Sequence, residues 1–491
     1  MRILTLLFLS FSQLTFASFD MNDNMQASYH HIINLDFEAA DLCLLKEESK
    51  NPRNGFILLH RNYIDFLTIL ISEDVRYFKS HEHLKDLRIG LIEKNDRDSP
   101  YYLYCKAELN IQWAVSRLKF GDYITSSYEL VKAYMLLKEN KKRFPDFLLN
   151  NKGLGLLHAF LGIIPENFHW ILRLTGVENA GVLRGINELD SVLNDNRFLM
   201  YEEEILFLLS FLNINLTNND ILCNKYLDRI GDRYRDNILL NFAAARLSHN
   251  LFKNDDCIHI LNNRPNNPKL FRFHYLDYLL AMSYLYNLDL DSAKSRFQFF
   301  LINFKGVNYI KSANHKLAWI AFLQDDKVMK NQYFLKVISD GSSLVDEDKV
   351  ALKEAKQGFI SDISLLRARL FFDGGYYALA LSELNQIKSP DSLSFQINKI
   401  EYWYRFARVY SKLKEDETLI IPYYQRSLDE GEEKSSYYAP MSALQLGFVY
   451  ENKKEFQKAK KYFYKCLTMS GFDYQRGIHQ KAKAGLERVS N

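Results

Sequence analysis

Near the C-terminal end of the chain, five residues follow a spacing typical of two tightly packed helices. Leu446, Gly447, Tyr450, Ala459 and Phe463 stand at offsets of 0, 1, 4, 13 and 17 residues. The small residues let two antiparallel backbones approach closely, while the leucine and the aromatic residues fill the space around that contact. The spacing therefore predicts a helical hairpin that cannot bury its apolar face alone.

The same spacing recurs upstream, and each copy places small residues on two successive helices. In one weaker copy, Lys330 stands where the second small residue is expected. The copies are Trp403, Phe406, Ala407 and Tyr410 with Tyr424 and Ser427; Ala368 and Phe371 with Tyr377, Ala380 and Leu384; Leu280, Ala281 and Tyr284 with Ala293 and Phe297; Leu317, Ala318 and Ala321 with Phe334; and Trp113 and Ala114 with Tyr123, Ser126, Leu130 and Ala133.

This repeated pattern resembles the tetratricopeptide repeat, whose period is about 34 residues. The resemblance is best over residues 275–470 and extends to residues 105–135. It implies an all-α fold, an α-solenoid of stacked antiparallel helix pairs in which neighbouring pairs close the core. Most copies start 37–40 residues apart, so we expect longer connections than in the family. Only 20 glycines and 9 prolines in 491 residues agree with a helical chain.

Residues 152–193 depart from the repeat. From Gly153 to Pro165 there is no acidic residue, lysine or arginine, and a helix that is apolar on all sides is a buried one. We expect Pro165 to break this helix, a second helix to follow it, and a third to start near residues 179–180.

The same segment resembles a short motif of exported bacterial tetratricopeptide proteins and of the tetratricopeptide-domain-39 family. We consider two interpretations, a buried helix pair that joins two halves of the solenoid, and an apolar hairpin that binds a lipid or a peptide. The shared elements are the apolar helix, Ile164-Pro165, the run from Trp170 to Leu174, Gly176 and Gly185.

The N-terminus has the features of a secretory signal peptide. Met1-Arg2 precedes an uncharged, mostly apolar stretch from Ile3 to Phe16, and Thr15-Phe16-Ala17 is an acceptable cleavage site. The apolar stretch is too short to span about 30 Å of hydrocarbon as a helix. We therefore expect export to the periplasm of a Gram-negative bacterium, with outer-membrane association or secretion as alternatives. The predicted regions are a signal peptide (1–17), an N-terminal repeat region (18–150), the apolar segment (151–195) and a C-terminal solenoid (196–491).

Charge and cysteine content point to no particular ligand. The net charge of +3 gives no reason to expect nucleic acid. The five cysteines are far apart and lack a CxxC spacing, so they signal neither a zinc site nor a dense disulfide framework. Cys257 and Cys466 fall where the repeat usually holds a small buried residue. One long-range disulfide is left open.

Sequence motifs for chemistry are absent. The chain has no HExxH, no phosphate-binding loop, no dinucleotide fingerprint and no GxSxG. The acidic clusters 202–204 and 346–348 are interpreted as helix-start or surface charges. We therefore predict no catalytic residue, no cofactor and no metal ligand.

In the family that the repeats resemble, one face of each first helix lines a concave groove. Aromatic and arginine side chains, which dominate binding hot spots, recur on this face. The alternative is that they pack between adjacent repeats. The candidate partner-binding residues are Tyr275, Tyr278, Met282, Tyr286, Arg369, Tyr404, Arg408 and Phe448.

The sequence thus predicts a non-enzymatic, exported scaffold that binds a protein or peptide partner in its groove. One alternative is a SusD-like glycan-binding outer-membrane protein, a class that usually carries a lipid-anchor cysteine and Gly/Pro/Trp-rich loops; this chain has 9 Pro and 4 Trp. Another is a lipid or membrane-surface factor that uses residues 153–176. The oligomeric state is left open.

Overall fold

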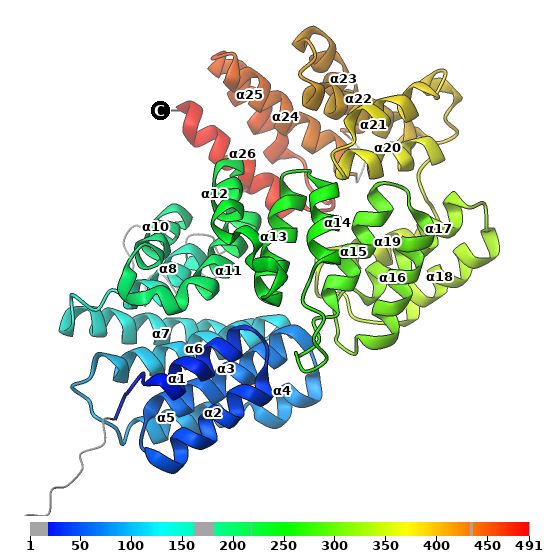
Figure 1. Ribbon diagram of the computed structural model, residues 1–491. Coiled ribbons are helices and arrows are strands. Elements are labelled where there is room, and N and C mark those ends of the chain that lie inside the picture. The colour runs from blue at the N-terminus through cyan, green and yellow to red at the C-terminus, as the bar shows by residue number, and fades with distance from the viewer. Residues whose placement is uncertain (1–17, 162–180, 218, 433–435, 491) are drawn as a thin grey trace, which may run out of the picture. The chain divides into compact units, whose positions relative to one another are not determined.

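The computed structural model describes residues 18–161, 181–217, 219–432 and 436–490. Every regular element in these ranges is a helix, and most consecutive helices pack against each other in pairs (Figure 1). The predicted all-α fold of paired, stacked helices is confirmed. The predicted signal peptide lies outside the described residues.

The chain divides into two compact units. Met1–Ala243 and Arg264–Phe273 form the first, and Ala244–Asn263 and His274–Asn491 form the second. The region boundaries predicted at residues 150 and 195 both fall within the first unit. This division does not test the four predicted regions, which stay a prediction.

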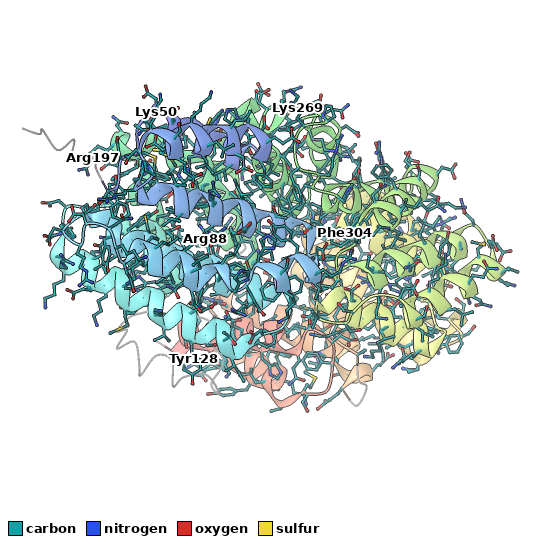
Figure 2. All side chains as sticks on the ribbon, turned by 90° about the horizontal axis from the view of Figure 1, so that it is seen from below. Lys50, Arg88, Tyr128, Arg197, Lys269 and Phe304 are labelled. Atoms are coloured by element: carbon teal, nitrogen blue, oxygen red, sulfur yellow. The ribbon has the colours of Figure 1, made fainter. Side chains whose placement is uncertain are left out.

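In the first unit, α1 packs on α2, α6 on α7, and α8 on α10. The α6–α7 contact is built as the sequence predicts, because Ala114 and Ala133 are fully buried and the Ser126 hydroxyl donates a hydrogen bond to the Ala114 carbonyl (2.9 Å). Tyr128 of α7 and Lys50 of α2 are exposed and lie at opposite edges of this unit in the view of Figure 2. The helices are α1 (Asp23–Ile33), α2 (Phe37–Lys50), α3 (Gly55–Ser72), α4 (Val75–His81), α5 (Leu84–Ile92), α6 (Pro100–Lys119), α7 (Tyr123–Arg143), α8 (Asn150–Leu161), α10 (Val182–Leu193), η2 (Asn196–Tyr201), α11 (Glu202–Leu212), η3 (Asn213–Thr217), α12 (Asp220–Ile230) and η4 (Gly231–Arg235).

The apolar segment supplies α8 and α10, whose backbones meet at two glycines. A Cβ atom on Gly155 would lie 2.6 Å from the Gly185 carbonyl oxygen, and a Cβ on Gly185 would lie 2.2 Å from that of Gly155. No other residue fits such a contact without a shift of the backbone. Most of α8 is buried, as predicted, while α10 begins at Val182, slightly later than expected. The predicted middle helix falls outside the described residues.

The second unit contains the best repeats. Its pairs are α15 with α16, α17 with α18, α20 with α21, α22 with α23, and α24 with α25. The stack is not strictly sequential, because α19 packs on α17 and α18, and α20 contacts α15. This extra helix explains the longest connection between copies. The helices are α13 (Ile238–Asn250, which crosses the unit boundary), α14 (Asn254–Asn262), α15 (Tyr275–Tyr286), α16 (Leu290–Asn303), α17 (Ile310–Leu323), α18 (Lys327–Ser339), α19 (Asp346–Gln357), α20 (Ile363–Asp373), α21 (Tyr377–Asn385), η5 (Pro390–Ser392), α22 (Gln396–Leu413), α23 (Glu417–Gly431), α24 (Tyr438–Asn452), α25 (Phe456–Thr468) and α26 (Gln475–Ser490).

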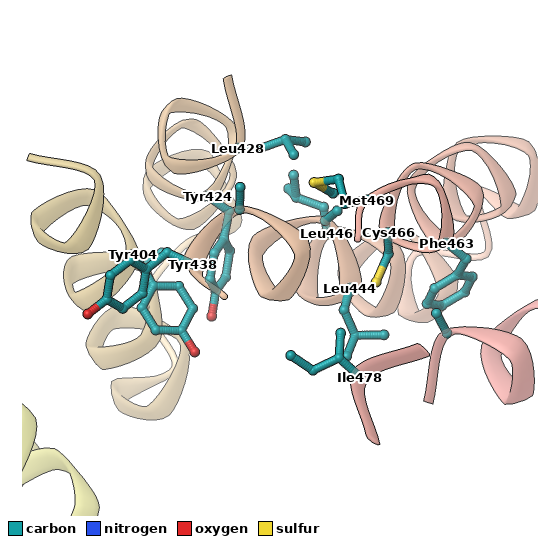
Figure 3. Packing of buried hydrophobic residues seen from close by; sticks show 14 of the residues in the cluster. Tyr404, Tyr424, Leu428, Tyr438, Leu444, Leu446, Phe463, Cys466, Met469 and Ile478 are labelled. Carbon is teal, nitrogen blue, oxygen red and sulfur yellow. The ribbon is translucent and has the colours of Figure 1, made fainter. Parts of the chain in front are cut away.

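Phe463 of α25 belongs to the most C-terminal core (Figure 3). It is fully buried, and a Cβ atom on Gly447 of α24 or on Gly485 of α26 would lie only 2.4 or 2.5 Å from its ring. The ring therefore fills the space that the two glycines leave open. Leu446 and Ala459 are also fully buried, as the repeat spacing requires.

All five cysteines are free thiols, and Cys257 and Cys466 are buried, which confirms that they act as small core residues. In the ranges that the structure covers, no helix combines the length and the apolar character needed to cross a membrane.

Candidate interaction surface

The four candidates on α15 line one small cavity in the second unit. This cavity has a volume of about 110 Å³. Residues of α13, α15 and α19 line it, together with Tyr309, which directly precedes α17. Its polar and aromatic lining consists of Arg246, His249, Tyr275, Tyr278, Ser283, Tyr286, Tyr309 and Glu347, and Met282 lies among them.

Stacked rings form the wall of the small cavity. Tyr275 lies 5.4 Å from Tyr278 and 4.6 Å from Tyr309, measured between ring centroids. His249 stacks on Tyr286 at 5.3 Å, and burial lowers the pKa of His249 to about 4, so its imidazole is neutral at pH 7. The hydroxyl groups of Tyr278 and Ser312 share a hydrogen bond of 2.8 Å.

Tyr278 and Tyr286 are buried, whereas Tyr275 and Met282 are partly exposed. The first two therefore act mainly in packing, and the second two are the side chains of α15 that a partner could touch.

Arg369 lines a second, larger cavity of about 460 Å³. The walls come from α17, α19, α20, α22 and the residues around the start of α24. Two lining acids form ion pairs, Asp473 with Lys353 (2.8 Å) and Glu401 with Arg405 (2.7 Å). Glu354 is hydrogen-bonded to the His315 ring (2.7 Å), and burial lowers the pKa of His315 to about 4, so this ring is neutral at pH 7. Its aromatic lining consists of Trp319, Phe359, Tyr437, Tyr438 and Tyr474.

Two cations lie against Trp319 in this region. The Lys316 ammonium is 3.4 Å and the Arg369 guanidinium 4.9 Å from its ring centroid. Burial, and next the charge of Arg369, lower the pKa of Lys316 to about 7. Burial alone would raise the pKa of Glu354, but the contact with His315 and the two cations outweigh burial and lower it to about 2. Glu354 is therefore a carboxylate at every physiological pH.

The remaining candidates differ in exposure. Tyr404 is buried in the C-terminal core, beside Tyr438 (5.3 Å between ring centroids). Arg408 is partly exposed and stacks on Phe372 at 3.8 Å. Phe448 packs edge-on against Phe463 at 5.5 Å. The structure thus brings five of the eight candidates to two cavities and leaves Tyr404, Arg408 and Phe448 outside the linings of both. Partner binding at any of them stays a prediction.

The sequence did not predict a buried polar cluster in the first unit. The Lys152 ammonium lies 2.8 Å from a Glu108 oxygen, 2.9 Å from a Glu204 oxygen and 2.8 Å from the Tyr63 hydroxyl. Glu204 lies in the first turn of α11, as expected for a helix-start charge, but it is not a surface charge alone, because it pairs with Lys152 and accepts a hydrogen bond from Tyr29. Because these groups are mutually paired, removal of one partner would leave a buried charge uncompensated.

The second acidic cluster lies in the first turn of α19, as expected, but one of its members is not on the surface. Asp348 is fully buried, and its carboxylate accepts hydrogen bonds from the backbone N–H groups of Tyr309 (2.7 Å) and Ser312 (2.8 Å). It thereby caps the N-terminus of α17 from another helix. Asp346 is an exposed residue that pairs with Lys349, as expected for a helix start.

A repeat position marks Trp319, on the wall of the larger cavity, and His315, whose ring lies 4.8 Å from that of Trp319. His315 and Trp319 hold the same repeat positions in the weaker copy around Ala318 as Tyr278 and Met282 hold in the copy around Ala281. The groove positions of the repeat therefore predict His315 and Trp319 in the copy around Ala318. Lys316, Glu354 and Tyr437 have no such signal, because neither a repeat position nor a motif marks them.

Comparisons with known proteins add no family. No family model matches the chain, and no curated protein matches it. A similar solved structure is a chain in the crystal structure of the APC/C hetero-tetramer Cut9-Hcn1, at 11% identity, with a TM-score of 0.28 over 95% of this chain and 96% of that chain. A score this low supports no argument about fold or function. Within the described ranges, no group of three or more His, Cys, Asp or Glu residues is arranged to hold a metal ion.

Proposed function

We propose that the chain is a non-enzymatic interaction scaffold of the tetratricopeptide type, which binds a segment of another protein along the first-helix face of its second unit. The observation that carries this proposal is the clustering of Tyr275, Met282 and Arg369 at cavities. Each is partly exposed, although repeat packing alone would bury an aromatic or thioether side chain. Aromatic and arginine side chains at cavities are typical of binding hot spots.

We also propose that the protein is exported and cleaved after Ala17. Ser18 begins the described structure, and its carbonyl oxygen accepts a hydrogen bond from the Gly55 N–H (2.7 Å), while its hydroxyl oxygen accepts one from the Asp96 N–H (3.2 Å). Cleavage after Ala17 would leave both contacts in place.

Site-specific photo-crosslinking tests the scaffold proposal. A benzophenone amino acid replaces Met282 in the full-length chain, expressed so that its signal peptide is retained. The matched control replaces Ile302, which is 68% exposed on the second helix α16. We expect a discrete adduct from position 282 and none from position 302. The partner, identified by mass spectrometry and purified, should bind the wild-type protein and bind an Arg369→Met variant more weakly.

Equal adducts at both positions would refute a groove-specific contact. The proposal also fails if the purified partner binds the Arg369→Met variant as tightly as the wild type.

A further inference from the structure

Two polar atoms on the wall of the larger cavity are buried without a hydrogen-bond partner. Trp319 is 3% exposed, and its indole N–H meets no acceptor among the residues that the structure describes. The Ser436 hydroxyl on the same wall is in the same state. Buried polar groups normally have partners, and an indole nitrogen can only donate. A molecule that fills this cavity should therefore carry hydrogen-bond acceptors.

Two carboxylates on the wall have the opposite requirement. One Glu354 oxygen accepts a hydrogen bond from the His315 ring (2.7 Å), and one Asp473 oxygen accepts one from Lys353 (2.8 Å). Within the described residues, the second oxygen of each carboxylate makes no hydrogen bond. Because an ionised carboxylate can only accept, the molecule should also carry donors.

The charges around the larger cavity are matched. Each acid on its wall faces a cation, in an ion pair or through a longer-range attraction that helps to hold the pKa of the acid low. The pairs are Glu401 with Arg405, Asp473 with Lys353, and Glu354 with Arg369. Neither an anion nor a cation would find an excess of opposite charge there, so the wall favours an uncharged ligand.

Hydroxyl groups meet all of these requirements, because a hydroxyl both donates and accepts and carries no charge. The rings of Phe359, Tyr437 and Tyr474 also line the cavity and provide flat apolar surface for the C–H groups of a saturated ring. A volume of about 460 Å³ lies in the range of small-molecule sites, which combine apolar walls with a few placed polar groups.

We propose that the larger cavity binds an uncharged, hydroxyl-rich small molecule of the monosaccharide class. The Trp319 indole N–H donates to one ligand hydroxyl, and the open oxygens of Glu354 and Asp473 accept from others. This site goes beyond the proposed scaffold function, because its ligand is small and requires neither Tyr275 nor Met282.

The indole resonances of the protein provide a direct test. The chain has four tryptophans, and the Trp319 signal in a ¹⁵N-tryptophan-labelled sample is assigned by its disappearance in Trp319→Phe. The probes are the methyl glycosides of glucose, galactose and mannose. We expect at least one of them to shift the Trp319 signal in a saturable manner. Tetrahydropyran, the same ring without hydroxyl groups, should leave this signal unchanged.

Variants connect binding to the wall residues. Trp319→Phe retains an aromatic ring and removes one donor, and Glu354→Gln places an amide N–H where the carboxylate offers an acceptor. Each should weaken the affinity for the glycoside about threefold to tenfold in calorimetry. The matched control is Trp403→Phe, because the Trp403 indole N–H donates to Glu430 (3.0 Å) away from the cavity wall. This variant should bind as the wild type does, and circular dichroism checks that all three are folded.

A shift of the Trp319 signal, together with weaker binding in both wall variants, supports the sugar site. The proposal is overturned if none of the three glycosides binds, which would mean that water alone fills the cavity. It is also overturned if tetrahydropyran binds equally well, if Trp319→Phe binds as the wild type does, or if Trp403→Phe shows the same loss. Crosslinks at position 282 test the scaffold function separately, so either proposal can fail while the other stands.

Discussion

Replacing Lys152 by methionine should strongly destabilise the first unit. The ammonium lies within 3.0 Å of Tyr63, Glu108 and both oxygens of Glu204. Lys152 and Glu108 are almost completely buried. Methionine keeps much of the volume and removes the charge, so that two carboxylates face each other without a cation.

The magnitude follows from the burial of the pair. Removing one partner of a buried ion pair costs about 3–5 kcal/mol, because the remaining charge is left uncompensated. We therefore expect Lys152→Met to lower the free energy of unfolding by this amount at pH 7. Adding Glu108→Gln should recover part of the loss, because it removes the like-charge repulsion while retaining hydrogen-bonding groups.

The pH dependence has a definite sign. Burial, and next the charge of Glu204, raise the pKa of Glu108 above 4.5 even though Lys152 opposes them. Without Lys152 the pKa rises further, so the folded variant takes up a proton more readily than the unfolded chain. A group whose pKa is higher in the folded state than in the unfolded chain stabilises the fold at low pH. This contribution is lost as the pH rises from about 4.5 through the folded pKa. The cost of Lys152→Met should therefore be smaller at pH 5 than at pH 7.

Urea denaturation at both pH values provides the measurement. The matched control is Lys225→Met, since Lys225 also pairs with a carboxylate, Asp190 at 2.6 Å, and lies over a tyrosine ring at 5.4 Å. Its side chain is 46% exposed, so its loss should cost no more than about 1 kcal/mol. The reasoning is refuted if both lysine variants cost the same, or if Glu108→Gln gives no recovery in the Lys152 background.

Three further predictions follow from the cores, the cavity and the N-terminus. Phe463→Ala should cost about 3–5 kcal/mol and Gly447→Ala about 1–3 kcal/mol in thermal unfolding; a neutral Gly447→Ala would contradict the packing against Phe463. Because the folded pKa of Lys316 is about 7 and the ordinary value is 10.5, wild-type stability should rise with pH between these values, and Lys316→Met should remove that rise in urea titrations at pH 7 and pH 9. Mass spectrometry of the exported protein should find Ser18 at the N-terminus, and an intact Met1 would refute cleavage.

The helical pairs were predictable because their decisive contacts are local. Gly447, Ala459 and Phe463 lie within one hairpin, so their spacing alone specifies which helix faces touch. The same holds for Ala114 and Ser126, whose contact spans two adjacent helices. In each case a small residue has one physical use, the close approach of two backbones.

The buried ionic cluster was not predictable for the opposite reason. Lys152 meets Tyr63 across 89 residues of sequence and Glu204 across 52. No spacing rule relates such positions, and a glutamate in the first turn of a helix is normally explained by the helix dipole. Glu204 has that position in α11 and yet is held by a lysine from another helix. Only the folded arrangement separates the two explanations.

Three arginines of the second unit combine both kinds of information, in Ala245-Arg246, Ala368-Arg369 and Ala407-Arg408. The alanine of each Ala-Arg pair is required for packing, and helix geometry then determines where the arginine lies, so a sequence pattern for the core also locates surface cations. What the pattern leaves undetermined is whether an acid from elsewhere neutralises them. Arg405 pairs with Glu401 at 2.7 Å, whereas Arg408, one turn later on the same helix, lies 3.8 Å from Asp373. Which acid faces each arginine is therefore known from the structure, whereas the repeat that positions the arginines is predictable from the sequence.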